Sequence, residues 1–143
     1  MTINVFFEDV EVGDRLPSWS RKTDFMHWNR YAAVNDEFIP IHMDDEAGRA
    51  AGHEGAIGMG TLRFAYIVNA LTAWIGDEAE IRELSCQYRT VNRKNDVLTV
   101  TGVVVEKFTQ DGEHRVRLET NVVNQRGEST CPGFAVVAVP SRG

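Results

Sequence analysis

The stretch TLRFAYIVNALTAWIG, residues 61–76, decides the fold. From Leu62 to Ile75 it is apolar on nearly all sides, and only Arg63, Asn69 and Thr72 interrupt it. A helix that is hydrophobic all round is buried on most of its surface rather than lying on the outside of a domain. We therefore expect a long central helix that the rest of the chain must cover.

The segments after Gly76 have the pattern of strands. Apolar and polar side chains alternate, and β-branched residues are frequent, in residues 84–88, 97–106, 114–123 and 134–140. Turn residues separate these segments at 95–96, 110–112 and 125–127, at spacings that suit an antiparallel meander. The second half of the chain therefore predicts about four antiparallel strands.

The segments before the central helix are shorter. Residues 5–22 suit extended pieces and a turn, and a helix should follow from a cap at Thr23 or Asp24 to Val34. We expect a loop at NDEFIPIH, because a proline biases the preceding residue toward an extended conformation. A short helix should then begin after an N-cap at Asp44 and stop at Gly52.

This order of elements predicts an α+β fold with a single domain over residues 1–143. The length suits one domain with a real core and is short for two. A helix as apolar as residues 62–75 needs a sheet wrapped around it. The predicted architecture is the hotdog fold, in which a curved antiparallel sheet encloses a central helix.

Composition and charge limit the classes of partner. The formal net charge of -6 disfavours nucleic acid and anionic membranes as main partners, because both call for a basic face. The first residues lack the pattern of a signal peptide and no apolar run is long enough to span a bilayer, so we expect a cytoplasmic location. Cys86 and Cys131 belong to no CxxC motif or Cys/His cluster, so we expect two buried, reduced thiols and no structural zinc site.

The segment YAAVNDEFIPIHMDDEAGRAAG, Tyr31 to Gly52, resembles the hydratase motif of MaoC-like (R)-specific enoyl-CoA hydratases, Y-A-x-x-S-G-D-x-N-P-[IL]-H-x-D. The opening FEDVEVGD, the segment GAIGMGTL and the segment IRELSCQYRTVNRKNDVLTVTGVV are also similar to that family. The resemblance covers most of the chain and implies a hotdog hydratase or dehydratase.

The resemblance assigns His42 as the catalytic histidine, with Pro40 and Asp44 positioning its loop. Glu37 stands where the family has its catalytic Asp, and Asp36 where it has Gly. We prefer Glu37 as the catalytic carboxylate, and Asp36 remains the alternative. Ile39 and Met59 also differ from the family, which has Asn and His at these places.

The family chemistry also needs a donor for the oxygen of the thioester. Hydration of an enoyl thioester requires a base for water, an acid for the α-carbon and a donor that stabilises the enolate oxygen. By resemblance that donor is a backbone N–H of Gly60 or Met59, at the start of the central helix, where free N–H groups favour negative charge.

Several residues allow more than one interpretation. Asp44 serves at least as a helix N-cap, and a charged Arg63 on an apolar helix should face a subunit interface or the substrate cleft. Phe64, Tyr66 and Trp74 are candidates for shaping a wide acyl pocket. The basic residues that either meet the phosphates of coenzyme A or are simply solvated are Arg89, Arg93, Lys94 and Lys107.

The resemblance implies an enzyme that adds water to an enoyl thioester, or removes it, to give a (3R)-hydroxyacyl thioester. No cofactor is expected beyond the acyl-CoA or acyl-carrier substrate, and the working unit should be a homodimer or larger, with a heterodimer possible. A hotdog thioesterase is an alternative, but residues 62–75 lack the acid that such enzymes place on the central helix. A second alternative is a non-catalytic subunit of a heteromeric hydratase.

Overall fold

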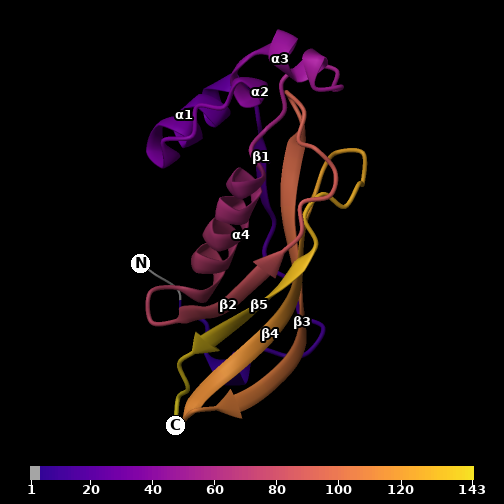
Figure 1. Ribbon diagram of the computed structural model, residues 1–143. Coiled ribbons are helices and arrows are strands. Elements are labelled where there is room, and N and C mark those ends of the chain that lie inside the picture. The colour runs from indigo at the N-terminus through magenta and orange to yellow at the C-terminus, as the bar shows by residue number, and fades with distance from the viewer. Residues whose placement is uncertain (1–3) are drawn as a thin grey trace.

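A five-stranded antiparallel sheet curls around helix α4 in the computed structural model, which describes residues 4–143 (Figure 1). The strand order is β1-β3-β4-β5-β2, so β1 and β2 form the two edges of the sheet. The sheet consists of β1 (Trp19–Lys22), β2 (Glu80–Cys86), β3 (Val97–Gln110), β4 (Glu113–Val123) and β5 (Gly133–Val139). This is the predicted hotdog fold.

Helix α4 (Gly60–Ile75) forms the centre of the core, as its sequence requires. Ile67 and Leu71 are fully buried, and Leu62 and Ile75 nearly so. Apolar side chains from alternate positions of β3 and β4 cover the helix, among them Val104 and Leu118. Burial of each large apolar side chain contributes roughly 1.5–3 kcal/mol relative to exposure.

A layer of three short helices lies beyond the N-terminal end of α4 (Figure 1). These are α1 (Phe25–Asn35), α2 (Pro40–Met43) and α3 (Asp45–Ala50). The side chain of Asp24 caps α1 by accepting hydrogen bonds from the N–H groups of Met26 and His27, and Asp44 caps α3 by accepting from the N–H of Glu46. The remaining helical turn is the 3₁₀ element η1 (Phe7–Asp9).

Most of the predicted elements are confirmed. The expected turn at 110–112 joins β3 to β4, with Asp111 and Gly112 at φ of 54° and 75°, the left-handed values of a tight hairpin turn. The expectation of about four strands was incomplete, because Trp19–Lys22 adds a fifth by pairing with β3.

Two local predictions of secondary structure were wrong, and Cys86 is only partly buried, whereas both cysteines were expected to be buried. The segment around Pro40 is not a loop throughout: Pro40 occupies the first turn of α2, where its missing N–H costs nothing. Strand β2 ends at Cys86, so Tyr88 lies outside the sheet. Among the described residues, no helix is long and apolar enough to cross a membrane.

Candidate active site

Helix α2 holds the imidazole of His42 in a fixed orientation. Its Nδ1 lies 2.7 Å from the backbone carbonyl oxygen of Ile57. A carbonyl can only accept a hydrogen bond, so Nδ1 carries the proton and Nε2 of the neutral ring has a free lone pair. The side chain is only 12% exposed, and the histidine therefore presents one defined nitrogen to its surroundings.

The carboxylate nearest to this nitrogen belongs to Glu37. Nε2 of His42 and Oε1 of Glu37 are 4.0 Å apart, which is too long for a direct hydrogen bond. This separation is one that a single water molecule can bridge with ordinary hydrogen bonds of about 2.8 Å to each atom. Glu37 is 28% exposed and has its N–H bonded to the carbonyl of Ala32, just past the end of α1.

Asp36, the alternative carboxylate, has a different position. It forms the C-cap of α1 in the left-handed conformation, with φ of 53° and ψ of 42°, and it is exposed. In the described part of the chain its carboxylate forms no ion pair with His42. The structure therefore brings Glu37 and His42 together and leaves Asp36 in solvent.

The N-terminus of α4 lies close to the histidine along the chain. Ile57, whose carbonyl accepts from His42, precedes Gly60 by three residues, a span of roughly 10 Å at most. The N–H of Ile57 bonds the carbonyl of Ile41, and the N–H of Gly58 bonds the carbonyl of Asn92, which fixes this approach. The same short segment of chain thus contacts His42 and leads into the N-terminus of α4.

The first turn of α4 offers free backbone donors. Met59 is the N-cap, is fully buried and provides no side-chain cap, so the first N–H groups keep the partial positive charge of a helix N-terminus. A Cβ at Gly60 would lie 2.9 Å from the ring of Tyr88. Glycine is therefore required at this position for the close approach of Tyr88.

Tyr88 is a residue of this site that the sequence did not single out. It is half-exposed and lies beside Gly60, although 28 positions separate them in the chain. Burial of its hydroxyl, together with the neighbouring Cys86 thiol, raises the pKa of Tyr88 to about 12. The phenol is therefore neutral at pH 7 and able to donate. The alternation of residues 84–88 had placed Tyr88 in a strand, so no sequence signal pointed to it.

Arg63 lies inside the protein, and neither an interface nor a cleft exposes it. It is only 4% exposed, and its Nη1 donates to the carbonyls of Thr90 and Thr130. Burial lowers the pKa of its guanidinium, and the neighbours that oppose this effect are Cys131, Tyr88 and Cys86 rather than a carboxylate. Arg63 thus ties two loops to the first turn of α4, and its Cζ lies 5.3 Å from the centroid of the Tyr88 ring.

The two loop-positioning residues of the motif have clear structural roles. Pro40 begins α2, and its carbonyl accepts from the N–H of Asp44. Asp44 therefore ends α2 with its backbone and caps α3 with its side chain. The expectation that Asp44 is an N-cap is confirmed.

The three aromatic residues proposed to shape an acyl pocket do not share one surface. Tyr66 is buried and packs on Trp19 with ring centroids 4.9 Å apart, whereas Phe64 is exposed. Trp74 lies near the end of α4, beside Val5 and Val10.

No group of three or more His, Cys, Asp or Glu side chains suited to a metal ion occurs among the described residues.

Known structures of the same shape include two (R)-hydratases. R-hydratase PhaJ1 from Pseudomonas aeruginosa is 24% identical over 97% of this chain and 88% of its own, with a TM-score of 0.88. The (R)-hydratase from A. caviae involved in PHA biosynthesis is 22% identical over 93% and 99%, with a TM-score of 0.84. The ChsH1-ChsH2 complex from Mycobacterium tuberculosis is 19% identical over 90% and 98%, with a TM-score of 0.80. At these identities the likeness establishes the fold.

The family itself follows from a comparison of sequence. Among curated proteins no match was found. The model of the family described as MaoC like domain matches residues 11–126, a segment that contains His42, Glu37 and all of α4. Since this match covers most of the 143 residues, the chain belongs to the MaoC-like domain family.

Proposed function

We propose that this protein is a hydro-lyase that adds water to a 2-enoyl thioester, or removes it in the reverse direction. The observation that carries the proposal is the pair of His42 and Glu37, with Nε2 and Oε1 4.0 Å apart and Nδ1 fixed on the Ile57 carbonyl. A histidine with one free lone pair beside a carboxylate is the arrangement that a water-activating site needs.

The reaction assigns a task to each group. A water molecule between the two side chains gives a proton to Nε2 of His42, and its oxygen forms a bond to C3 of the enoyl group. The electron pair of the C2–C3 double bond moves to the thioester, where the oxygen becomes an enolate. The proton then reaches C2 and completes the addition. Glu37 accepts a hydrogen bond from the water and orients it for attack.

The enolate oxygen is stabilised by the N-terminus of α4. The N–H of Gly60 or Met59 donates to the developing negative charge, and the partial positive charge of the helix terminus adds to this effect. Loss of one such donor costs roughly a hundredfold to a thousandfold in kcat in enzymes where it has been measured. By resemblance to the family, the hydrated product is the (3R)-hydroxyacyl thioester.

We also propose that the working unit is a homodimer or a larger assembly, with a heterodimer as the alternative. Strand β2 is an edge of the sheet, and an unpaired edge is a ready surface for a second copy. Sedimentation analysis of the purified chain should give a multiple of 16.0 kDa. A stable monomer with full activity would contradict this part of the proposal.

The test is hydration of crotonyl-CoA, followed by the loss of enoyl thioester absorbance, with His42→Ala and Glu37→Gln beside the wild type. We expect both variants to lose at least a hundredfold in kcat, the usual contribution of a positioned acid or base. Wild-type turnover that survives in His42→Ala would sink the mechanism.

Asp36→Asn decides between the two candidate carboxylates. Asparagine tolerates the left-handed conformation of this position, so the substitution removes the charge without straining the backbone. We expect Asp36→Asn to retain the wild-type rate. If its rate falls while that of Glu37→Gln does not, Asp36 is the catalytic carboxylate and the loop rearranges with substrate.

A non-catalytic subunit is the second candidate function. It is favoured by Glu37, Ile39 and Met59, which differ from the residues of the family motif. Glu has one more methylene than Asp, and a misplacement of about 1 Å can cost about a hundredfold in rate. Inactivity of the pure protein that is relieved by a co-expressed homologous subunit would establish this alternative.

A further inference from the structure

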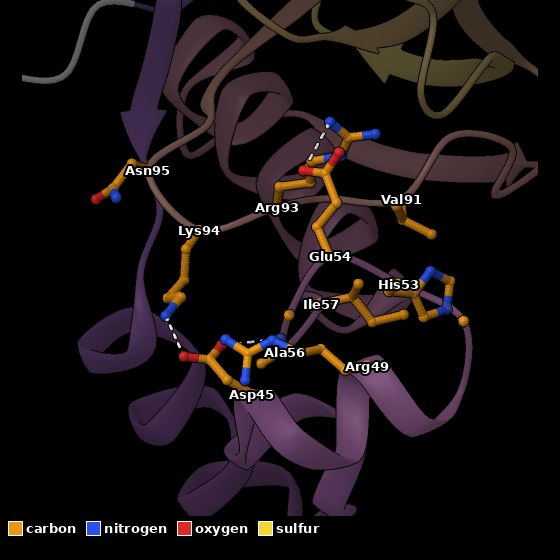
Figure 2. A pocket seen from close by; sticks show the side chains of 12 residues that line it. Asp45, Arg49, His53, Glu54, Ala56, Ile57, Val91, Arg93, Lys94 and Asn95 are labelled. Atoms are coloured by element: carbon orange, nitrogen blue, oxygen red, sulfur yellow. Dashed lines mark hydrogen bonds and ion pairs between the residues drawn. The ribbon is translucent and has the colours of Figure 1, made fainter.

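A hollow of about 490 Å³ lies between α3 and the loop that joins β2 to β3 (Figure 2). Its volume is in the range of small-molecule sites, roughly 300–1,000 Å³. Neither His42 nor Glu37 lines it. The basic side chains that surround it are Arg49, His53, Arg93 and Lys94.

The wall of this hollow is built by close backbone contacts. Asp45 at the start of α3 accepts hydrogen bonds from Nζ of Lys94 at 2.6 Å and from the N–H of Ala56 at 3.0 Å. A Cβ at Gly48 would lie 2.0 Å from the carbonyl oxygen of Gly55, so only glycine permits this packing. The hollow is thus a defined part of the fold.

Positive charge exceeds negative charge in the hollow. Asp45 pairs with Lys94, and Glu54 pairs with Arg93 at 3.3 Å through side chains that are mostly exposed. Among the described residues Arg49 forms no ion pair within 4.0 Å. The pKa of the Asp45 carboxyl is held below its usual range mainly by the hydrogen bond from Lys94, and the charge of Arg49 adds to this effect. One full positive charge therefore remains without a partner of its own.

The apolar lining of the same hollow includes one residue that also contacts the candidate active site. The side chains of Ile57 and Val91 line the hollow near His53 (Figure 2). Ile57 is also the residue whose carbonyl holds Nδ1 of His42. A ligand in the hollow thus rests on the segment that orients the catalytic histidine.

We propose that this hollow binds the nucleotide end of a coenzyme A thioester, with its phosphates on Arg49, Lys94 and Arg93 and its adenine against Ile57 and Val91. This inference rests on the proposed function, since it assumes that the thioester enters the site beside His42. Arginine and lysine are the side chains best suited to phosphate oxygens. An apolar wall beside them suits a flat ring better than it suits a free phosphate ion.

The charge of the whole chain favours a nucleotide over an acyl carrier protein. The formal net charge of -6 repels an acidic protein partner over a broad surface. A small anion in a hollow experiences mainly the local charges, because salt screens the more distant ones over about 8–10 Å. The substrate handle that fits is therefore the adenosine 3′,5′-bisphosphate end of coenzyme A.

Direct binding tests the proposal without any catalytic readout. The probe is adenosine 3′,5′-bisphosphate, titrated calorimetrically into the wild type, Arg49→Gln and Arg117→Gln. Arg49 is exposed and has no ion pair, so its loss leaves the fold intact. Arg117, on β4, loses the same charge and lies over the ring of Phe134, outside this hollow.

We expect Arg49→Gln to weaken binding about tenfold, the loss of one charge-assisted hydrogen bond, and Arg117→Gln to stay within about twofold of the wild type. Equal affinities in wild type and Arg49→Gln overturn the proposal. So does inorganic phosphate binding as tightly as the nucleotide, which would make the hollow a general anion site.

Steady-state kinetics provide a second test of the proposed nucleotide site. We expect Arg49→Gln to raise the KM for crotonyl-CoA about tenfold with little change in kcat, and to leave the hydration of crotonyl-N-acetylcysteamine, which lacks phosphates, unchanged. If crotonyl linked to an acyl carrier protein is the only substrate impaired, the hollow binds a carrier and the nucleotide assignment is wrong. Absence of hydration with every thioester refutes the proposed function, while the binding titration still decides the nucleotide site.

Discussion

At the scale of single residues, the hydrogen bond between His42 and the Ile57 carbonyl has the largest consequence for chemistry. It fixes the tautomer and directs Nε2 toward Glu37. The same segment of chain, residues 56–58, also contacts Ile41 and Asn92 through its backbone. The geometry of the proposed active site therefore depends on backbone contacts as much as on the two side chains.

The first prediction concerns the buried charge of Arg63. We expect Arg63→Met to lower the free energy of unfolding by about 1–3 kcal/mol, because the carbonyl of Thr90 loses its side-chain donor and that of Thr130 keeps only the backbone N–H of Arg89, while the apolar volume is kept. Urea unfolding measures this change.

The matched control for Arg63→Met is Arg89→Met, since the Arg89 side chain is exposed and in the described structure bonds only the side chain of Gln87. We expect a change within about 0.5 kcal/mol for this variant. Equal effects of the two substitutions would show that the buried hydrogen bonds of Arg63 contribute nothing to stability.

At the scale of elements, α3 packs against the chain that follows it through a glycine. Gly48 is buried, and Gly55 passes directly over it. This contact positions the segment that leads to Ile57 and to the start of α4. The length of α3, six residues, makes its stability depend on such contacts rather than on helix propensity.

The second prediction concerns Gly48, where helix propensity and side-chain packing have opposite effects on the stability of an alanine variant. Helix propensity alone predicts that Gly48→Ala stabilises the protein by about 1 kcal/mol. We expect instead a loss of about 1–3 kcal/mol, because the added methyl group meets the carbonyl of Gly55. Chemical denaturation gives the sign directly, and a stabilised variant would contradict the described packing.

The third prediction concerns the cap of α1. Asp24 accepts from the N–H groups of Met26 and His27 and from Nδ1 of His27. We expect Asp24→Ala to cost about 1 kcal/mol and Asp24→Asn to cost less, since asparagine is an equally good N-cap. Thermal unfolding of the two variants measures the difference, and equal losses would assign the effect to the charge of Asp24.

At the scale of the whole molecule, one buried carboxylate joins two loops that are distant in sequence. Asp96 precedes β3, and its side chain is only 3% exposed. It accepts hydrogen bonds from Arg126, Gln125 and the N–H of Arg93. The loop before β3 is thereby attached to the turn between β4 and β5, next to the hollow proposed to bind the nucleotide.

The fourth prediction is the pH dependence of this attachment. Burial alone would raise the pKa of Asp96, but hydrogen bonds from Arg126 and Gln125 outweigh it and hold the pKa below the ordinary value of 3.8. The unfolded chain therefore takes up this proton first as the pH falls below 3.8, and stability is lost there. Above that pH the contribution is fully present.

Asp96→Asn tests this dependence. We expect the variant to be about 1–3 kcal/mol less stable than the wild type at pH 7, and the difference to shrink at pH 3. Urea midpoints at the two pH values measure it. A difference that stays constant would show that the charge of Asp96 is not involved.

The sequence by itself determined the elements whose signals are local. The all-round apolar character of residues 62–75, the alternation along β3 and β4, and the cap at Asp44 each depend on neighbours within a few positions, whereas the sequence left the cap of α1 open between Thr23 and Asp24. Such patterns persist in almost any tertiary context, because they reflect hydrogen-bonding geometry and the period of helix and strand. They were sufficient for the hotdog fold, and the resemblance to MaoC-like hydratases supplied the candidate residues.

Only the tertiary structure decided which side chains meet. Tyr88 over Gly60, Arg63 on the Thr90 and Thr130 carbonyls, and Lys94 on Asp45 all join positions at least 25 apart in the chain. The edge strand β1 is likewise too short for its sequence to predict it, and it forms because it pairs with β3. These contacts follow from the curvature of the sheet and the placement of the helical layer, which no local pattern records.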